Sequence, residues 1–535
     1  MSVHGYQWAV ACLCAASLFL GSSCRKSPQR PKHQELHFSL KSDPVSFDPR
    51  KCADHASSAV INLCFEGLTR LDAHSNPEMA LASSVEVSED KTVYLFHLRE
   101  AYWSDGTKIT ASDFENTWKT LLDPAFPCEF ANNLYIIKNA RAAKTKGGSL
   151  GDIGIQSLDE SRLRVELEHP VPYFLSSLAC TYFFPCPAER ASTLKRGEEE
   201  RYVVSGPFRI KSFRSQDSIV FEKNPFYWDR EQVRLERVTF SLVQDEGTEL
   251  SMFERGELDW AGYPLSNLPT DAIRSLAKRK TLEEYPIAGT YFYTFNTKKF
   301  PFNNVHIRRA FALAMNREEI VTNVTEMDQM PATALIPGLV WGEKSSSYFK
   351  DNDATEARRS FNKGLQELGL SKSQFPKVSL SYNSLTGHHK IAQAIQQQWR
   401  AVLGIESTLE NKEWKVFLDE VRQGEFQVAR MGFLALAPDP IAFLDPYRYL
   451  SSSLNQSGWS NPTFSELLEE ADFTQDPVER FALLKKAESI LVHDMPIAPI
   501  YFYTGAYVKK PYVKGVILSE LNILDLKRAY IDMDD

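Results

Sequence analysis

One stretch of the sequence matches a catalytic motif. Residues 147–151 read GGSLG, which fits the G-x-S-x-G pattern of serine hydrolases. In those enzymes the serine, here Ser149, lies on a sharp turn between a buried strand and a helix, where its hydroxyl can act as a nucleophile. Residues 144–146 (KTK) are polar and do not form such a strand. We therefore interpret residues 147–151 as a glycine-rich loop and predict no catalytic residue.

Motifs for metals and nucleotides are also missing. His33, Glu35 and His37 are each two positions apart, whereas the zinc-binding helix needs two histidines one turn apart with a glutamate next to the first. We assign these three residues to an N-terminal tether. The cysteines lack the paired spacings of structural zinc sites, and no Walker loop or dinucleotide fingerprint occurs. We predict no metal and no cofactor, so ATP hydrolysis would have to come from partner proteins.

The N-terminus has the features of an export signal. Residues 8–20 (WAVACLCAASLFL) are uncharged and shorter than the about 20 apolar residues that span a bilayer, but their length fits a signal peptide. Small residues then precede Cys24, an arrangement that resembles a bacterial lipoprotein cleavage site. We predict a signal peptide over residues 1–23, lipidation of Cys24, and a flexible tether over residues 24–34. The alternatives are an uncleaved anchor or a chance apolar start.

Five cysteines would remain after such processing: Cys52, Cys64, Cys128, Cys180 and Cys186. Because five is odd, at least one would stay a thiol or pair between chains. Cys180 and Cys186 could close a small loop if their geometry allows it. The chain is therefore not predicted to be a disulfide scaffold.

The composition is that of a folded, water-soluble protein. Of 535 residues, 43% are hydrophobic and 24% are charged, which excludes disorder and allows two or three cores. Lys and Arg number 61 against 69 Asp and Glu, a formal net charge of -8. A phosphate-binding surface needs a basic excess, so we predict no nucleic-acid partner.

Strand and helix patterns alternate along the chain. Residues 92–98 and 162–167 alternate apolar and polar side chains, which predicts strands with one buried face. Residues 111–122 and 391–403 repeat apolar side chains every three or four positions, which predicts helices packed on one side. The predicted fold class is therefore mixed α/β.

Short motifs spread in order over nearly the whole mature chain resemble one protein family. They include Phe47-Asp48-Pro49, Phe65-Glu66-Gly67-Leu68, Trp103-Ser104-Asp105-Gly106, Gly206-Pro207-Phe208, Lys223-Asn224-Pro225-Phe226-Tyr227-Trp228, Gly256-Glu257-Leu258-Asp259 and Pro301-Phe302-Asn303-Asn304-Val305. In residues 411–443, Trp414 and the run Ala429-Arg430-Met431-Gly432-Phe433 complete the set. By these motifs the chain is similar to the periplasmic oligopeptide-binding proteins of ABC importers, which are extracellular solute-binding proteins of family 5.

The resemblance implies a periplasmic-binding-protein fold, in which two α/β lobes close on a ligand by a hinge. Lobe I is expected over residues 35–69, 203–288 and 505–535, its extra subdomain over 70–202, and lobe II over 289–504. A monomer of this kind would act on the periplasmic or cell-surface side of the cytoplasmic membrane. Its partners would be an ABC permease and the ATPase subunits of that permease.

The resemblance also implies which uncharged residues contact the ligand. Trp414 matches a pocket tryptophan, Phe433 replaces a second tryptophan with a smaller ring, and Phe130 takes the place of a pocket tyrosine. Gly432 lacks a Cβ, so it lets the backbone approach a ligand closely.

The two ends of a peptide are expected to be recognised differently. Arg430 and His388 match positions that can meet a C-terminal carboxylate. The family aspartate that pairs with the N-terminal ammonium is replaced by Leu436, and breaking a buried ion pair from one side costs about 3–5 kcal/mol. Asp439 could partly substitute, or it could instead cap or turn the chain before Pro440.

These features predict a lipid-anchored, extracytoplasmic binding protein, not an enzyme, that captures oligopeptides and delivers them to an ABC permease. An alternative within the same fold is a ligand without a free N-terminal ammonium, such as a cell-wall-derived or blocked peptide, haem or a metal chelate. A more remote alternative is a surface hydrolase or interaction protein on the same scaffold.

Overall fold

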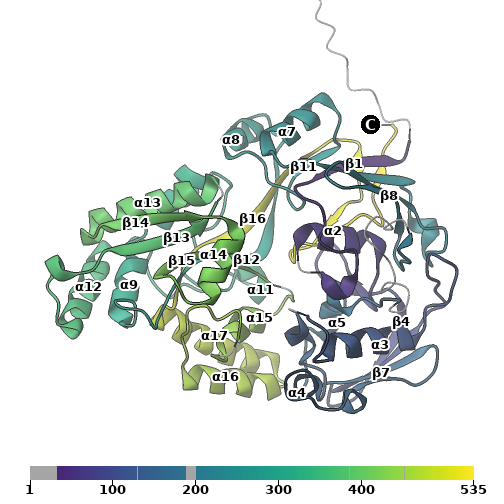
Figure 1. The fold of residues 1–535 in the computed structure, drawn as a ribbon, viewed down its shortest axis with the longest axis horizontal. Coiled ribbons are helices and arrows are strands. Elements are labelled where there is room, and N and C mark those ends of the chain that lie inside the picture. Colours follow the sequence, from purple (N-terminus) through teal and green to yellow (C-terminus); the bar gives the residue numbers. More distant parts are fainter. Residues whose placement is uncertain are drawn as a thin grey trace, which may run out of the picture.

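The computed structural model of the chain describes residues 33–52, 54–128, 130–187, 201–384, 386–435, 437–450 and 452–534. The predicted signal peptide, Cys24 and Leu436 lie outside these residues. Figure 1 shows two bodies, one purple to teal and the other green, joined by the long strands β12 and β16. Helices and strands alternate along both bodies, so the predicted mixed α/β class is confirmed.

The first body is built on two four-stranded sheets. One has the order β1 (Glu35–Leu40), β10 (Arg237–Leu242), β9 (Ser218–Lys223) and β8 (Phe208–Arg214). The other has the order β4 (Ala82–Val87), β5 (Val93–Leu98), β7 (Arg162–Glu166) and β6 (Ile155–Ser157). Strands β5 and β7 are those predicted from residues 92–98 and 162–167, and they pair antiparallel with each other. Alternate residues of both strands are buried in one core that spans the first body.

The helices of the first body pack on these sheets. They are α2 (His55–Cys64), α3 (Ala111–Leu122), α4 (Ala140–Lys146), α5 (Phe174–Ser177), α7 (Glu246–Arg255) and α8 (Thr270–Lys278). Helix α3 occupies the predicted residues 111–122, and a capping box between Thr110 and Asp113 starts it. Its Trp118 is fully buried and donates a hydrogen bond from Nε1 to the carbonyl oxygen of Phe183 at 3.0 Å.

The second body surrounds one end of a six-stranded sheet. The strand order is β11 (Trp260–Gly262), β16 (Ile497–Lys509), β12 (Glu283–Phe295), β15 (Val428–Leu434), β13 (Val378–Asn383) and β14 (Ser407–Lys412). The helices are α9 (Val305–Leu313), α10 (Arg317–Ile320), α11 (Gly338–Trp341), α12 (Ala354–Leu368), α13 (Thr386–Leu403), α14 (Trp414–Arg422), α15 (Ile441–Leu444), α16 (Pro462–Phe473) and α17 (Pro477–Asp494). Helix α13 contains the predicted helix 391–403 and begins five residues before it.

Strands β12 and β16 carry the chain from one body to the other (Figure 1). The C-terminal end of β16 pairs with β11, whereas β12 pairs with β15 from Gly289 onward. Between these regions the pairing of β12 with β16 is interrupted from Pro286 to Thr290. A break in a two-stranded connection is a place where two bodies can rotate relative to each other. The predicted lobe boundaries at residues 289 and 505 fall in this region and remain predictions.

Two details of the first body correct or confirm the sequence interpretation. Glu35 and His37 belong to β1, and the backbone nitrogen of His37 donates to Oδ2 of Asp259 at 2.7 Å. Assigning these two residues to a tether was therefore wrong. Residues 147–151 follow helix α4, which ends at Lys146 and is capped by Gly147 in the left-handed region, and they lead into the 3-10 turn η3 (Leu150–Asp152), so the GGSLG stretch is confirmed to lack a preceding strand.

The five described cysteines are all thiols. Cys180 and Cys186 do not form the small disulfide loop that their spacing allowed. The Cys186 thiol instead donates to Oδ1 of Asp48 at 3.5 Å. Burial raises the pKa of the Cys64 thiol.

No helix in the described part of the chain is long and apolar enough to cross a membrane.

Candidate functional site

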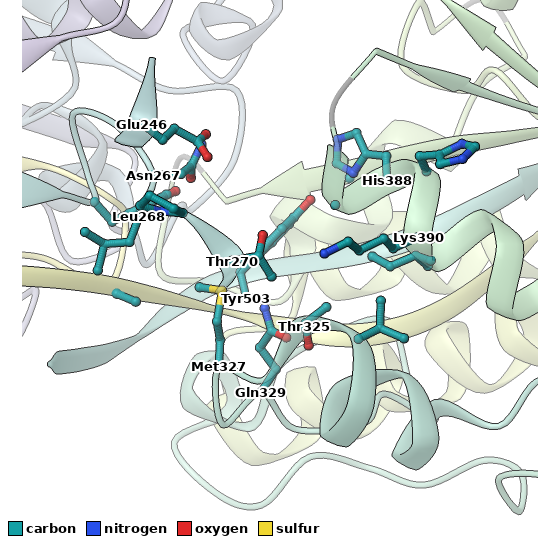
Figure 2. Close-up of a pocket in the computed structure, with 18 of the residues that line it drawn as sticks. Glu246, Asn267, Leu268, Thr270, Thr325, Met327, Gln329, His388, Lys390 and Tyr503 are labelled. Atoms are coloured by element: carbon teal, nitrogen blue, oxygen red, sulfur yellow. The ribbon is translucent and has the colours of Figure 1, made fainter. Parts of the chain in front are cut away.

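A pocket of about 1250 Å³ lies between the two bodies, beside strand β16. In Figure 2, Glu246, Asn267 and Leu268 lie on the side of the first body, and His388 and Lys390 face them from helix α13. Between these two walls lie Tyr503, Thr325, Met327 and Gln329. Of the ligand-binding residues predicted from the sequence, His388, Arg430 and Gly432 line this pocket.

Arg430 reaches the pocket because side chains alternate along strand β15, so that Arg430, Gly432 and Leu434 share one face. Its Nη2 atom donates to the hydroxyl of Tyr503 at 3.1 Å. The guanidinium carbon lies 4.6 Å from the ring centroid of Tyr291, a cation–π contact. Nε is buried and has no hydrogen-bond partner among the described residues. No carboxylate of the described chain forms an ion pair with Arg430, so this half-buried cation lacks a counter-ion among the described residues.

His388 adds a neutral polar group beside Arg430. Its Nδ1 lies 3.3 Å from the hydroxyl of Tyr291. Burial, and secondly the positive charge of Arg430, lower the pKa of His388 to about 2. The imidazole is therefore uncharged at neutral pH, and its charge does not change between about pH 5 and 8, the range in which an ordinary histidine titrates. Beside His388 the positive charge comes from Arg430, and the exposed Lys390 on the same helix adds a second one to the pocket.

Gly432 is required by a neighbouring side chain of the protein itself. A Cβ at this position would collide with the hydroxyl oxygen of Tyr503. That hydroxyl is the one that accepts the hydrogen bond from Arg430. The glycine therefore makes room for the tyrosine that positions the arginine, and close approach of a ligand to Gly432 stays a prediction.

The three predicted aromatic contacts do not line the pocket. Phe433 points to the other face of β15, where its ring centroid lies 5.1 Å from that of Phe443. Trp414 is the first residue of α14 and is 47% exposed. Phe130 precedes the turn η2 (Ala131–Leu134) and packs against the core of the first body. Their roles in ligand binding remain predictions.

Asp439 forms a buried ion pair with Arg480. Its carboxylate accepts hydrogen bonds from Nη1 and Nη2 of Arg480 at 2.8 and 3.0 Å. The exposed fractions are only 5% for Asp439 and 4% for Arg480. Oδ1 also accepts from the backbone nitrogen of Ile441 at the start of α15. This geometry favours the capping role of Asp439 over contact with a ligand ammonium.

Several residues of the pocket are not found by sequence reasoning. Tyr501, Tyr503, Gln329, Lys390 and Leu434 line it, and Tyr291 contacts both Arg430 and His388. A signal for the tyrosines is present, because the runs YFY at residues 291–293 and 501–503 place tyrosines on one face of a strand. No local pattern marks Gln329, which lies in a loop.

Comparison with known proteins gives consistent matches over nearly the whole chain. The family model for bacterial extracellular solute-binding proteins, family 5 Middle, matches residues 76–455. The oligopeptide-binding protein OppA of Bacillus subtilis (strain 168) is 41% identical over 502 residues, which are 92% of each chain.

Solved structures agree with this match. Haemophilus influenzae OppA in complex with the peptide RPPGFSPFR has a TM-score of 0.82 and 29% identity, covering 94% of this chain and 100% of that chain. The murein tripeptide binding protein MppA of Escherichia coli has a TM-score of 0.84 and 28% identity, covering 94% and 99%. The unliganded open form of MppA has a TM-score of 0.73, with 94% and 98% covered. The described chain thus differs more from that open form than from the other two structures.

Proposed function

Because the chain belongs to the bacterial extracellular solute-binding proteins of family 5, we propose that it captures oligopeptides outside the cytoplasm and delivers them to the permease of an ABC importer. The matches confirm two predictions made from the sequence, the family and the two-lobed fold. A relative that is 41% identical is an oligopeptide-binding protein, and a structural neighbour is a peptide complex. These relatives are binding proteins, and the proposal contains no catalytic step.

The observation that carries the proposal is the uncompensated charge of Arg430. Arg430 is half-buried in the pocket wall, and a partly desolvated cation without a protein counter-ion favours an anionic ligand, because an isolated charge in a low-dielectric environment is costly. The C-terminal carboxylate of a peptide has the charge and the planar geometry that a guanidinium binds through two hydrogen bonds. If the Tyr291 hydroxyl donates to Nδ1 of His388, Nε2 carries the proton and donates to the same carboxylate. Arg430 and His388 together then hold one end of the ligand.

The rest of the ligand would be enclosed by closure of the two bodies about β12 and β16. Trp414, exposed on α14, together with Phe433 and Phe130, is proposed to contact the ligand in the closed form. Side chains of the peptide would lie in the roomy pocket, where ordered water can adapt to different residues. This arrangement uses no resident metal or cofactor.

The proposal is tested with ligands rather than with variants. Mass spectrometry of small molecules released from the gently purified protein should identify peptides. Calorimetric titration should then give tighter binding of a synthetic peptide with a free C-terminal carboxylate than of its C-terminal amide. Release of a non-peptide ligand, together with equal binding of acid and amide, would mean that the pocket serves another class of ligand.

Leu436 should decide how the N-terminal end of a peptide is recognised. An apolar side chain is a poor neighbour for an ammonium but an acceptable one for an acetylated end. We expect the wild-type protein to bind free and N-acetylated peptides about equally or to prefer the acetylated one. Leu436→Asp should shift the ratio toward the free amine by about a decade, which corresponds to about 1.4 kcal/mol. Calorimetry with both peptides measures this ratio.

Leu436→Asn is the matched control, because it adds polarity at the same position without charge. It should leave the ratio within about twofold of the wild-type value. A strong wild-type preference for the free amine would contradict the prediction and would mean that another acid holds the ammonium.

Lipidation of Cys24 is proposed to keep the monomeric protein at the outer face of the cytoplasmic membrane, close to the permease and its ATPase subunits. A single acyl chain binds membranes weakly, so bacterial-type anchoring needs the several chains that a modified N-terminal cysteine can carry. Cys24→Ala should therefore release the protein into the soluble extracytoplasmic fraction. Ser27→Thr, in the predicted tether, is the control and should stay in the membrane fraction. A Cys24→Ala protein that remains fully membrane-bound would contradict the anchor.

A further inference from the structure

The segment from Val321 to Met330 has an unusual backbone where it borders the pocket. It begins with a π-helical turn, η7 (Val321–Thr325), and π-helical turns are rare and occur often at functional sites. Glu326 and Asp328 then have φ angles of 55° and 46°, in the left-handed region that residues other than glycine rarely adopt. Such strain persists only where the surrounding structure holds it in place.

Contacts from both bodies hold this segment. The Glu326 carboxylate accepts a hydrogen bond from Nη2 of Arg274, on α8 of the first body, at 2.8 Å. At the other end, the carbonyl oxygen of Met330 accepts from the backbone nitrogen of Phe502 in β16 at 3.0 Å. Between these points, Met327 packs against the apolar cluster that contains Leu268 and Ile273. The position of the intervening residues is therefore defined on both sides.

This backbone places Gln329 in the wall of the pocket (Figure 2). The side chain is only 7% exposed, and its Oε1 atom has no hydrogen-bond partner in the described chain. Buried polar atoms are normally hydrogen-bonded, so an unpartnered acceptor in a residue that lines a cavity requires an explanation. The neighbouring Thr325 does not supply a donor, because its hydroxyl donates to the carbonyl oxygen of Val321 at 3.3 Å.

Gln329 lies apart from Arg430. Residues 330–332 pair with β16 on the edge opposite β12, and Arg430 lies on β15 beyond β12. Three strand spacings of roughly 4.8 Å thus separate the two backbones by about 14 Å across the sheet. Gln329 and Arg430 thus come from different parts of the pocket wall, and Gln329 gives the pocket a second polar position.

We propose that Gln329 is a ligand-binding residue whose side-chain carbonyl accepts a hydrogen bond from a backbone N–H of a bound peptide. The proposal rests on the proposed function. The side-chain carbonyl of Gln329 is a neutral acceptor and therefore suits a neutral donor. Its pocket neighbours are also uncharged, namely Thr325, Met327 and Tyr501. A bound ammonium would instead need a carboxylate. The backbone N–H is such a donor and is present in peptides of any sequence. This contact would add affinity without selecting side chains.

The test combines one substitution with removal of single N–H groups from the ligand. Pentaalanine and its four versions with one N-methylated peptide bond are titrated against the wild-type protein and Gln329→Met, a variant of similar volume. N-methylation at the bond that faces Gln329 should weaken wild-type binding about tenfold more than it weakens binding to Gln329→Met. At the other bonds the penalty should be the same in both proteins. Because Oε1 has no protein partner to lose, Gln329→Met should keep the melting temperature of the unliganded protein.

Asn267→Leu serves as the matched control, since Asn267 is an exposed side-chain amide on the opposite wall of the same pocket. At each of the four peptide bonds, N-methylation should weaken binding to Asn267→Leu as much as it weakens binding to the wild-type protein. If every penalty is equal in the wild-type protein and Gln329→Met, the inference is wrong while the proposed function stands. If the wild-type protein binds none of the five peptides, nor any peptide of the earlier titrations, the proposed function fails and this inference with it.

Discussion

Replacing Arg430 with methionine should lower the affinity for a peptide with a free C-terminal carboxylate by about two to three decades. The substitution removes the guanidinium that is proposed to hold the ligand carboxylate and leaves that carboxylate without this partner. Breaking a buried ion pair from one side costs about 3–5 kcal/mol, and 1.4 kcal/mol corresponds to a decade in the dissociation constant. Calorimetric titration of both proteins measures the difference.

Two controls separate this role from a structural one. Lys390→Met removes an exposed positive charge of the same pocket and should change the affinity less than about threefold, because solvent screens that charge. Arg430→Met should unfold at nearly the same denaturant concentration as the wild-type protein, since it loses the hydrogen bond to Tyr503 and the contact with Tyr291 but breaks no ion pair among the described residues. Binding of the C-terminal amide should change little. Equal weakening for acid and amide would place the peptide carboxylate elsewhere.

Replacing Asp439 with leucine should lower the free energy of unfolding by about 3–5 kcal/mol. Arg480 would keep its buried position but lose both hydrogen bonds to the carboxylate, and the start of α15 would lose its cap. Equilibrium unfolding in urea, followed by a probe of the second body, measures the loss. The preference between free and N-acetylated peptides should not change, because the carboxylate is occupied within the protein.

The double variant Asp439→Leu with Arg480→Leu should recover part of the lost stability, because no unpaired charge then stays buried. The exposed pair Lys108–Glu160, at 2.8 Å, is the matched comparison, and Glu160→Gln should leave the urea midpoint nearly unchanged, because solvent screens this pair. If Asp439→Leu kept full stability but reversed the preference for the N-terminus, Asp439 would be a ligand contact after all.

Local patterns were sufficient for the elements and for the family. The alternation in residues 92–98 and 162–167 and the helical spacing in 111–122 come from burial of one face, which neighbouring residues largely decide. The family motifs likewise consist of turn and core residues that are close together in the chain. For such features the prediction needs little knowledge of distant contacts.

The boundary of the tether shows where this reasoning fails. His37 looked like part of a polar leader, but its backbone pairs in β1 and contacts Asp259, more than two hundred residues away. Asp439 poses the same problem, because its partner Arg480 lies on helix α17, which is distant from Asp439 in the sequence. In both cases a long-range contact decides the role of a residue whose local sequence suits more than one role.

The sequence by itself determined the α/β class, the family, and the presence of Arg430, His388 and Gly432 among the candidate residues. Only the tertiary structure decided that Arg430 faces a pocket among tyrosines from two other strands without a carboxylate partner, and that Gln329 has an unsatisfied acceptor. The physical reason is that charge compensation and hydrogen-bond satisfaction depend on every group within a few ångströms. Strands β12, β15 and β16, which are far apart in the chain, bring those groups together only when the sheet forms.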